Sequence, residues 1–181
     1  GARVLVRCYH GLGDTIQFVR FLPLLGQRAR TVTLWVQPAL MPLLAWTPGL
    51  GHLLALHDGV PDAAFDVDVE IMELPYVFRT RLETIPSDVP YLHVEPLDLG
   101  PKRYPRVALI WIAGDWNSER TIPSQAIRPL LAARGLDWHR LHRYAVGWEN
   151  SSDGPILDLA RGLAAMDLVI TVDTMTAHLA G

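Results

Sequence analysis

The sequence has almost no cysteine, since Cys8 is the only one among 181 residues. A single thiol excludes an intrachain disulfide and any metal site built on paired CxxC motifs. Such sparse cysteine fits a reducing compartment, and we expect a cytoplasmic protein. Cys8 lies in the apolar run RVLVRCY, which predicts a small side chain buried in the core.

Long apolar runs and an excess of basic residues are also missing. No stretch approaches the roughly 18 apolar residues of a membrane span, and no signal peptide precedes the first predicted strand. The formal net charge of -3 argues against a dedicated nucleic-acid binder. We therefore expect neither a nucleic-acid partner nor a membrane span, whereas peripheral membrane contact and the oligomeric state stay open.

Several catalytic motifs are absent as well. The sequence contains no GxxxxGK[ST], HExxH or GxSxG, so P-loop, zinc-protease and serine-hydrolase interpretations have no support. His139 and His142 form the only close histidine pair. Zinc needs three or four converging ligands, so we predict a solvated or core pair here and no metal site. No cofactor is expected.

Carboxylates are scarce at the amino-terminal end. Between Gly1 and His57 only Asp14 is acidic, against five arginines, which are Arg3, Arg7, Arg20, Arg28 and Arg30. This imbalance predicts a positive local field suited to an anionic ligand. Solvated helix faces and caps would explain the same arginines.

The first half of the chain alternates strand and helix patterns. Strands are predicted over residues 3–9, 31–37, 51–58 and 65–75, and helices over 15–30, with a kink or early stop at Pro23, and over 38–46. In FDVDVEIMELP, apolar and acidic residues alternate, which predicts a strand near a sheet edge. Strands joined by short helices indicate βα units and a parallel sheet.

A linker rich in proline and glycine, residues 91–106, precedes a second set of elements. Strands are predicted over 106–114, 137–144 and 167–173, and helices over 124–135 and 156–166. We predict an α/β protein of two Rossmann-like domains, 1–98 and 99–181. The second has three strands at most, so we expect it to be incomplete, and the missing initiator methionine suggests an excerpt of a longer chain.

The segment GLGD, Gly11 to Asp14, follows a strand and precedes a helix. Gly11 and Gly13 would let a ligand approach the backbone. As a dinucleotide fingerprint the segment fails, because its third glycine is replaced by Ile16 and no suitable acid follows. Asp14 has two interpretations, a general base at the carboxyl edge of the sheet or the N-cap of the following helix.

The terminal segment TVDTMTAHLAG repeats this layout. A strand ends at Asp173, and a helix is predicted to begin at Thr174 and to continue past His178. Free N–H groups at its start, with the hydroxyls of Thr174 and Thr176, would favour an anion. An ordinary capped helix with His178 in the core is the alternative.

The third candidate is the polar loop GDWNSERTIP, residues 114–123. Arg120 is its cation, and a guanidinium there could bind two phosphate oxygens. A plain surface loop would have the same composition.

Five segments together carry a resemblance: GLGDTIQFVRFLP, TVTLWVQPALMPLL, ELP…TIPSDVPYL, IWIAGDWNSERTIP and AAMDLVITVDTMTAHLAG. The chain resembles the ADP-heptose:lipopolysaccharide heptosyltransferase family of GT-B glycosyltransferases, most closely the bacterial branch often fused behind tetratricopeptide repeats. It departs from the family at Met175, where a glycine is usual.

The resemblance implies two Rossmann-like domains, metal-independent transfer and inversion at the anomeric carbon. It implies that Asp14 deprotonates the acceptor hydroxyl. Asp173 and Thr174 match the family's donor-site pair, and His178 and Arg120 match positions near the diphosphate. The expected partners are a nucleotide-sugar donor and a glycan or protein acceptor.

Two other functions compete with transfer. The predicted lack of carboxyl-terminal strands is consistent with a catalytically inactive or truncated module that binds nucleotide sugars or acts as a scaffold. An NAD-dependent oxidoreductase is disfavoured by the broken glycine fingerprint.

Overall fold

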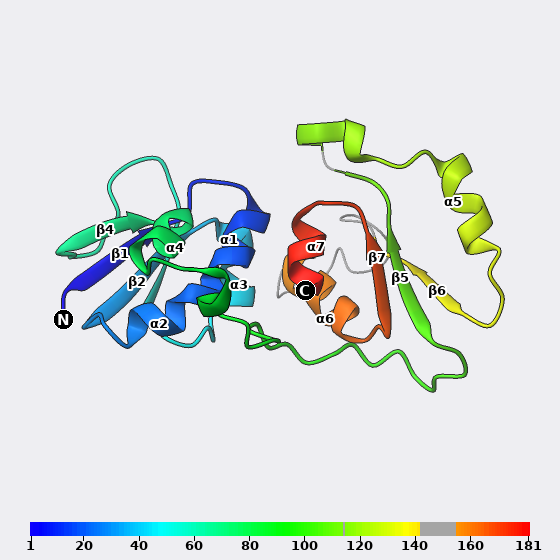
Figure 1. Cartoon of the computed structure of the whole chain (residues 1–181), viewed down its shortest axis with the longest axis horizontal. Helices are drawn as coiled ribbons and strands as arrows, with labels where there is room; N and C mark the ends of the chain where they lie inside the picture. Colours follow the sequence, from blue (N-terminus) through cyan, green and yellow to red (C-terminus); the bar gives the residue numbers. More distant parts are fainter. Residues whose placement is uncertain (114, 142–154) are drawn as a thin grey trace. The chain divides into compact units, whose positions relative to one another are not determined.

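The computed structural model describes residues 1–113, 115–141 and 155–181. The chain divides into two compact units, Gly1–His93 and Val94–Gly181, and each is described by itself. Both are α/β with wholly parallel sheets (Figure 1).

Unit 1 is built on a four-stranded parallel sheet in the order β3-β2-β1-β4. Its strands are β1 (Arg3–Arg7), β2 (Thr31–Val36), β3 (His52–Ala55) and β4 (Val67–Glu70). In register, Val4 lies opposite both Val32 and Val67. The predictions of a parallel sheet and of an edge position for β4 are confirmed.

The two central strands are apolar because they are covered on both sides. Leu5, Val6 and Leu34 are almost completely buried, and Ile16 from the first helix joins them. Each such side chain contributes about 1.5–3 kcal/mol by leaving water. In edge strand β4 burial does not follow the alternation, because Val67 is exposed whereas Val69 and Glu70 are half-buried.

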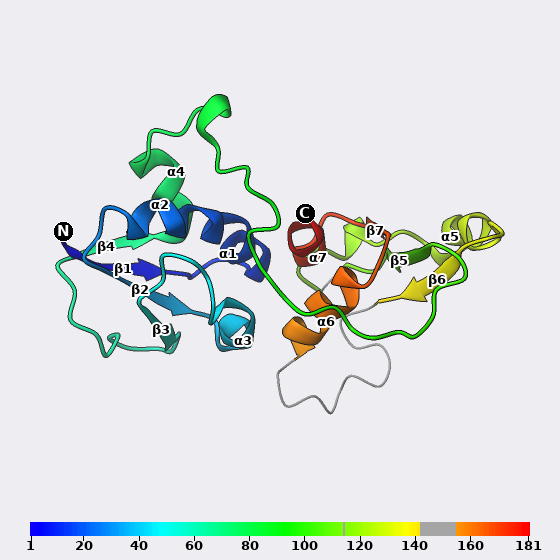
Figure 2. The same ribbon diagram turned by 90° about the horizontal axis from the view of Figure 1, so that it is seen from below.

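Short helices connect the strands of unit 1. They are α1 (Leu12–Phe18), α2 (Leu22–Gly26), α3 (Met41–Leu44) and α4 (Leu74–Val77), with 3-10 segments at Val19–Phe21, Pro38–Leu40, Ile71–Glu73 and Leu82–Thr84. The single helix predicted over 15–30 is in fact α1, a 3-10 turn and α2. Pro23 occupies the first turn of α2, where its missing N–H costs no hydrogen bond. Figures 1 and 2 both show α1 and α3 at the end of the sheet where its strands finish.

The stretch between the units makes hydrogen bonds within unit 2. Leu97 N–H donates to the Arg161 carbonyl at 3.0 Å, and Arg161 Nε donates to the Glu95 carbonyl at 3.3 Å. Arg106 Nη2 donates to the carbonyls of Leu99 and Gly100 at 3.1 and 2.6 Å. These bonds join the stretch that follows His93 to the rest of unit 2.

Unit 2 contains a three-stranded parallel sheet in the order β6-β5-β7. Its elements are β5 (Arg106–Ile110), a 3-10 segment η5 (Asp115–Arg120), α5 (Ser124–Leu131), β6 (Asp137–Arg140), α6 (Pro155–Ala164), β7 (Leu168–Thr171) and α7 (Met175–Ala180). Its core joins Ala108 and Ile110 of β5 to Leu159 and Leu163 of α6. Within the described ranges, no helix is long and apolar enough to cross a membrane.

Candidate functional site

Asp14 lies in the first turn of α1 and not at its N-cap. The cap is Gly11, whose backbone N–H donates to Asp14 Oδ2 at 3.0 Å. Asp14 therefore caps the helix from the N3 position, so the predicted hydrogen bond from a backbone N–H is present although the N-cap residue itself is Gly11. Gly13 lies inside the helix, and Gly11 has an ordinary φ of -66°. Asp14 is half-buried at the carboxyl end of β1, with Oδ1 making no hydrogen bond among the described residues.

A side-chain network fixes the turn that carries Asp14. The Gln37 amide donates to the His10 carbonyl at 2.7 Å and accepts from the Thr15 hydroxyl at 3.1 Å. Gln37 directly follows β2, so it ties the ends of two neighbouring strands together. Thr15 is fully buried, which holds this polar bridge away from competing water.

An aromatic cluster that sequence reasoning missed lies at the same edge of the sheet. The rings of Tyr9 and His57 each meet Trp35 edge to face, with centroids 5.6 and 5.5 Å away. Trp35 is only 2% exposed, whereas Tyr9 is 50% exposed. The Arg7 guanidinium lies 5.4 Å from the Tyr9 ring centroid and pairs with Asp68 at 2.8 Å. No local sequence pattern indicates this cluster, because it depends on the strand register that places Arg7 opposite Trp35.

Cys8 is fully buried beneath this edge, which confirms the core prediction. Burial raises the pKa of its thiol to about 12. A hydrogen bond to Thr15 opposes that shift and the nearby Glu70 carboxylate adds to it. Cys8 is therefore a neutral thiol and no nucleophile near neutral pH.

In unit 2 the structure brings together two of the predicted site residues, Arg120 and Asp173. Arg120 Nη1 donates to the Asp173 backbone carbonyl at 2.8 Å and lies 3.4 Å from its Oδ2 atom. Asp173 follows β7, and Arg120 ends η5. A guanidinium therefore lies at the carboxyl end of the sheet, where ligands bind in open α/β folds.

The segment carrying Arg120 is a 3-10 helix over Asp115–Arg120, where an irregular loop was predicted. The residues that follow this helix form hydrogen bonds with the residues that follow β5. Thr121 Oγ1 accepts from the Ala113 N–H, and Ile122 N–H donates to the Trp111 carbonyl, both at 2.9 Å. Gly114, the first residue of the predicted loop, lies outside the described residues.

The remaining candidates follow β7. Thr174 is the N-cap of α7, but its hydroxyl donates back to the Val172 carbonyl at 3.4 Å and does not cap the helix. Thr176 is 7% exposed and belongs to the buried part of unit 2. His178 is half-buried in the last turn. Thr174 directly follows Asp173, the residue that Arg120 contacts, whereas the Thr176 side chain is buried.

Two further predictions concern metal ligands and the histidine pair. Within the described ranges no group of three or more potential ligands could hold a metal ion. His139 lies 3.1 Å from Asp137, and its predicted companion His142 is outside those ranges.

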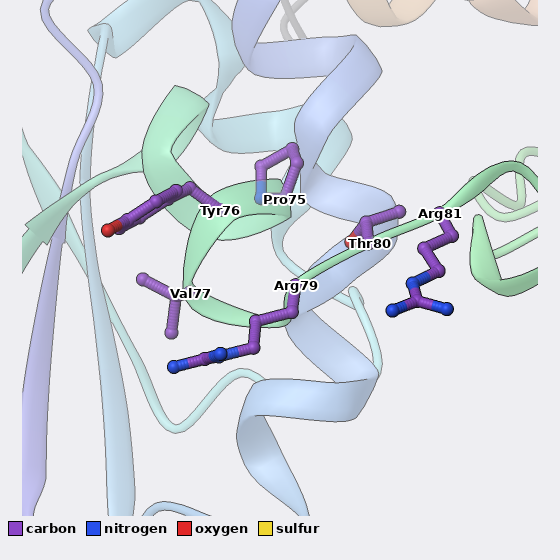
Figure 3. A pocket seen from close by; sticks show the side chains of 6 residues that line it. All are labelled: Pro75, Tyr76, Val77, Arg79, Thr80 and Arg81. Atoms are coloured by element: carbon purple, nitrogen blue, oxygen red, sulfur yellow. The ribbon is translucent and has the colours of Figure 1, made fainter.

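A pocket of about 690 Å³ lies on unit 1 at the end of α4, lined by Pro75, Tyr76, Val77, Arg79, Thr80 and Arg81. Figure 3 shows Tyr76, Val77 and Arg79 projecting to one side of α4, while Arg81 lies apart. None of the predicted site residues contributes to it.

We compared the chain with protein families, curated proteins and solved structures. Models of protein families give no match, and curated proteins give none either. Among solved structures, the crystal structure of the glycosyl transferase family 9 from Veillonella parvula DSM 2008 is similar, with a TM-score of 0.66 and 14% identity. The match covers 99% of this chain and 77% of that one.

The chain has a GT-B-like glycosyltransferase fold. This confirms the predicted fold class of Rossmann-like α/β units with parallel sheets. In such folds ligands approach the carboxyl ends of the strands, and that is where Asp14 in one unit and Arg120 with Asp173 in the other are found.

Proposed function

We propose that this chain acts as an inverting, metal-independent glycosyltransferase that uses a nucleotide-diphosphate sugar, with heptose among the candidate sugars. The acceptor is a hydroxyl of a glycan or of a protein. The observation that carries the proposal is the contact of Arg120 with Asp173 at the end of β7, in a fold similar to that of a family 9 glycosyl transferase.

The donor side of the proposal concerns the negative charge of the nucleoside diphosphate that leaves. As the anomeric C–O bond breaks, negative charge grows on the departing nucleoside diphosphate. Preorganised N–H donors stabilise such charge strongly because they need no rearrangement during the reaction. Arg120 supplies guanidinium N–H donors, partly offset in charge by Asp173, and Thr174 and His178 follow in the same segment. Such donors could bind the diphosphate oxygens directly, and this is the basis on which we propose a metal-independent mechanism.

The acceptor side rests on Asp14. The acceptor hydroxyl oxygen forms the new bond to the anomeric carbon, the bond to the diphosphate breaks, and the hydroxyl proton passes to Asp14. The Gly11 N–H engages Oδ2 and orients the carboxylate, which leaves Oδ1 for the proton. A positioned general base is worth about 10² to 10⁴ in rate.

Nucleotide binding tests the donor side of the proposal, and turnover tests the acceptor side. Calorimetry with ADP, UDP and GDP should detect binding of at least one, and the Arg120→Ala variant should bind it more weakly. Release of nucleoside diphosphate from ADP-glucose, UDP-glucose and GDP-mannose, in the presence of glycan and peptide acceptors and of EDTA, then measures turnover. Asp14→Asn should retain diphosphate affinity and lose about 10²-fold or more in rate.

Asp62→Asn is the matched control, since Asp62 is an exposed acid of the same unit, and it should leave turnover unchanged. Normal turnover by Asp14→Asn would remove the base assignment. Binding without any turnover by the wild type would instead favour a nucleotide-sugar-binding module.

A further inference from the structure

The contact between Arg120 and Asp173 uses only one edge of the guanidinium. Both contacts, to the Asp173 carbonyl at 2.8 Å and to its Oδ2 at 3.4 Å, are made by Nη1. Nη1 is the terminal nitrogen on the same side as Cδ. The opposite edge carries the Nε–H and one Nη2–H side by side, and these donors have no hydrogen-bond partner among the described residues.

That second edge is the one that suits a phosphate. Two parallel N–H groups match two oxygens of one phosphoryl group, and such bidentate contacts are shorter and stronger than single ones. Arg120 is 44% exposed, so a ligand can reach it. A flexible arginine loses rotational freedom when it binds, and an arginine already held in place loses less.

We propose that Asp173 is a positioning residue, which holds Nη1 of Arg120 so that the Nε–H and Nη2–H edge faces the diphosphate of the donor. The identity of the ligand rests on the proposed function. The contacts to Asp173 are made within unit 2 by the chain itself.

In the alternative, the Asp173 carboxylate binds hydroxyls of the donor sugar. The two roles predict opposite changes in the affinity for a nucleoside diphosphate when the carboxylate is neutralised. A carboxylate that only bonds the sugar repels the diphosphate, so its neutralisation should strengthen or not change the binding of a nucleoside diphosphate without a sugar. A positioning carboxylate has the opposite effect, because its loss frees the guanidinium.

The test is a double-mutant cycle on the affinity for ADP, UDP or GDP, whichever binds the wild type. Asp173→Asn keeps the backbone carbonyl contact and removes the charge, so we expect about two- to five-fold weaker binding, the size of an exposed ion pair. In an Arg120→Ala background the same change should not weaken binding. Arg120→Lys should not restore affinity, because lysine has the charge without the fork. Equal or tighter binding by Asp173→Asn alone would overturn the proposal.

A second measurement needs no ligand. In the wild type, the NMR signal of the Arg120 Nε–H should report a restricted guanidinium, and Asp173→Asn should increase its mobility. Arg128, exposed on α5, is the internal reference and should not respond. Failure of the wild type to bind any nucleoside diphosphate would contradict the proposed function. An unchanged Arg120 signal in Asp173→Asn would contradict a positioning role of the Asp173 carboxylate, because the contact to the backbone carbonyl remains in that variant.

Discussion

Arg3 and Asp66 form a reciprocal clamp at the start of two neighbouring strands. Asp66 Oδ2 accepts the Arg3 backbone N–H at 2.8 Å, and Asp66 Oδ1 accepts from Arg3 Nη2 at 2.6 Å. In return, the Asp66 N–H donates to the Arg3 carbonyl at 2.9 Å. Asp66 precedes edge strand β4 and Arg3 begins β1, so the clamp fixes how these strands align.

Unit 2 has an equivalent contact at the start of β5 and β7, two neighbouring strands of its sheet. Asp167 precedes β7 and accepts the N–H of Arg106, the first residue of β5, at 2.8 Å, while its own N–H donates to the Arg106 carbonyl at 2.9 Å. Lys102 completes it with a contact of 2.7 Å to Asp167 Oδ1. The two units show no sequence repeat, yet both fix the start of a strand with an aspartate.

Because of the clamp between Arg3 and Asp66, we expect unit 1 to lose stability in acid. Hydrogen bonds from Arg3 lower the pKa of Asp66 from 3.8 to about 2. A carboxylate with a lowered folded-state pKa stabilises the protein at pH values above its unfolded pKa, and this contribution disappears as the pH falls through the folded value. Unit 1 should therefore lose stability between about pH 4 and pH 2. Asp66→Asn should remove this dependence and lower the melting temperature near pH 7.

Asp62→Asn provides the comparison for the clamp, because it removes an exposed acid from the same unit. Thermal unfolding at a series of pH values measures both variants. Parallel profiles for Asp66→Asn and the wild type would contradict the role of the clamp.

A second prediction concerns Gly49, where two backbone segments meet. Gly49 has φ of +85°, and a side chain there would overlap the carbonyl oxygen of Leu22. Gly49→Ala should therefore destabilise unit 1 by more than about 1 kcal/mol, since backbone strain and steric overlap add. Chemical denaturation measures the change.

Gly100→Ala separates the two causes. Gly100 also has a positive φ, +70°, but nothing among the described residues lies within 4 Å of the new Cβ. We expect a smaller loss from this variant. Equal losses would show that strain alone accounts for the effect of Gly49→Ala.

A third prediction concerns the reactivity of Cys8. Because burial raises its pKa to about 12, almost no thiolate exists at pH 8, and the side chain is also inaccessible. Iodoacetamide should leave the folded protein unmodified at pH 8 and should alkylate it in guanidinium chloride. Mass spectrometry reads out the added group, and rapid labelling of the folded chain would be inconsistent with a buried thiol.

Local patterns in the sequence account for much of this fold. The apolar runs at β1 and β2 and the alternation at β4 predict buried and edge strands, because a strand's side chains report directly on the burial of its two faces. Pro23 correctly indicates that the helix after β1 is interrupted. These features depend on residues close together in the chain.

Features that depend on distant residues escaped prediction. The clamp between Arg3 and Asp66 and the edge-to-face contact of Tyr9 with Trp35 join segments at neighbouring strands, so strand order and register must be known first. Arg120 and Asp173 were each selected by local pattern and family resemblance, while their contact comes from the structure.

The last prediction concerns Gln37, which bridges the His10 carbonyl and the Thr15 hydroxyl beside Asp14. Each hydrogen bond contributes about 0.5–1.5 kcal/mol, so Gln37→Ala should lower the free energy of unfolding by about 1–3 kcal/mol. It should also speed hydrogen exchange of the Gly11 amide, whose bond to Asp14 depends on the shape of this turn. Gln27→Ala, an exposed glutamine in the same unit, should change neither quantity. Unaltered Gly11 exchange in Gln37→Ala would mean that the bond to Asp14 forms without this bridge.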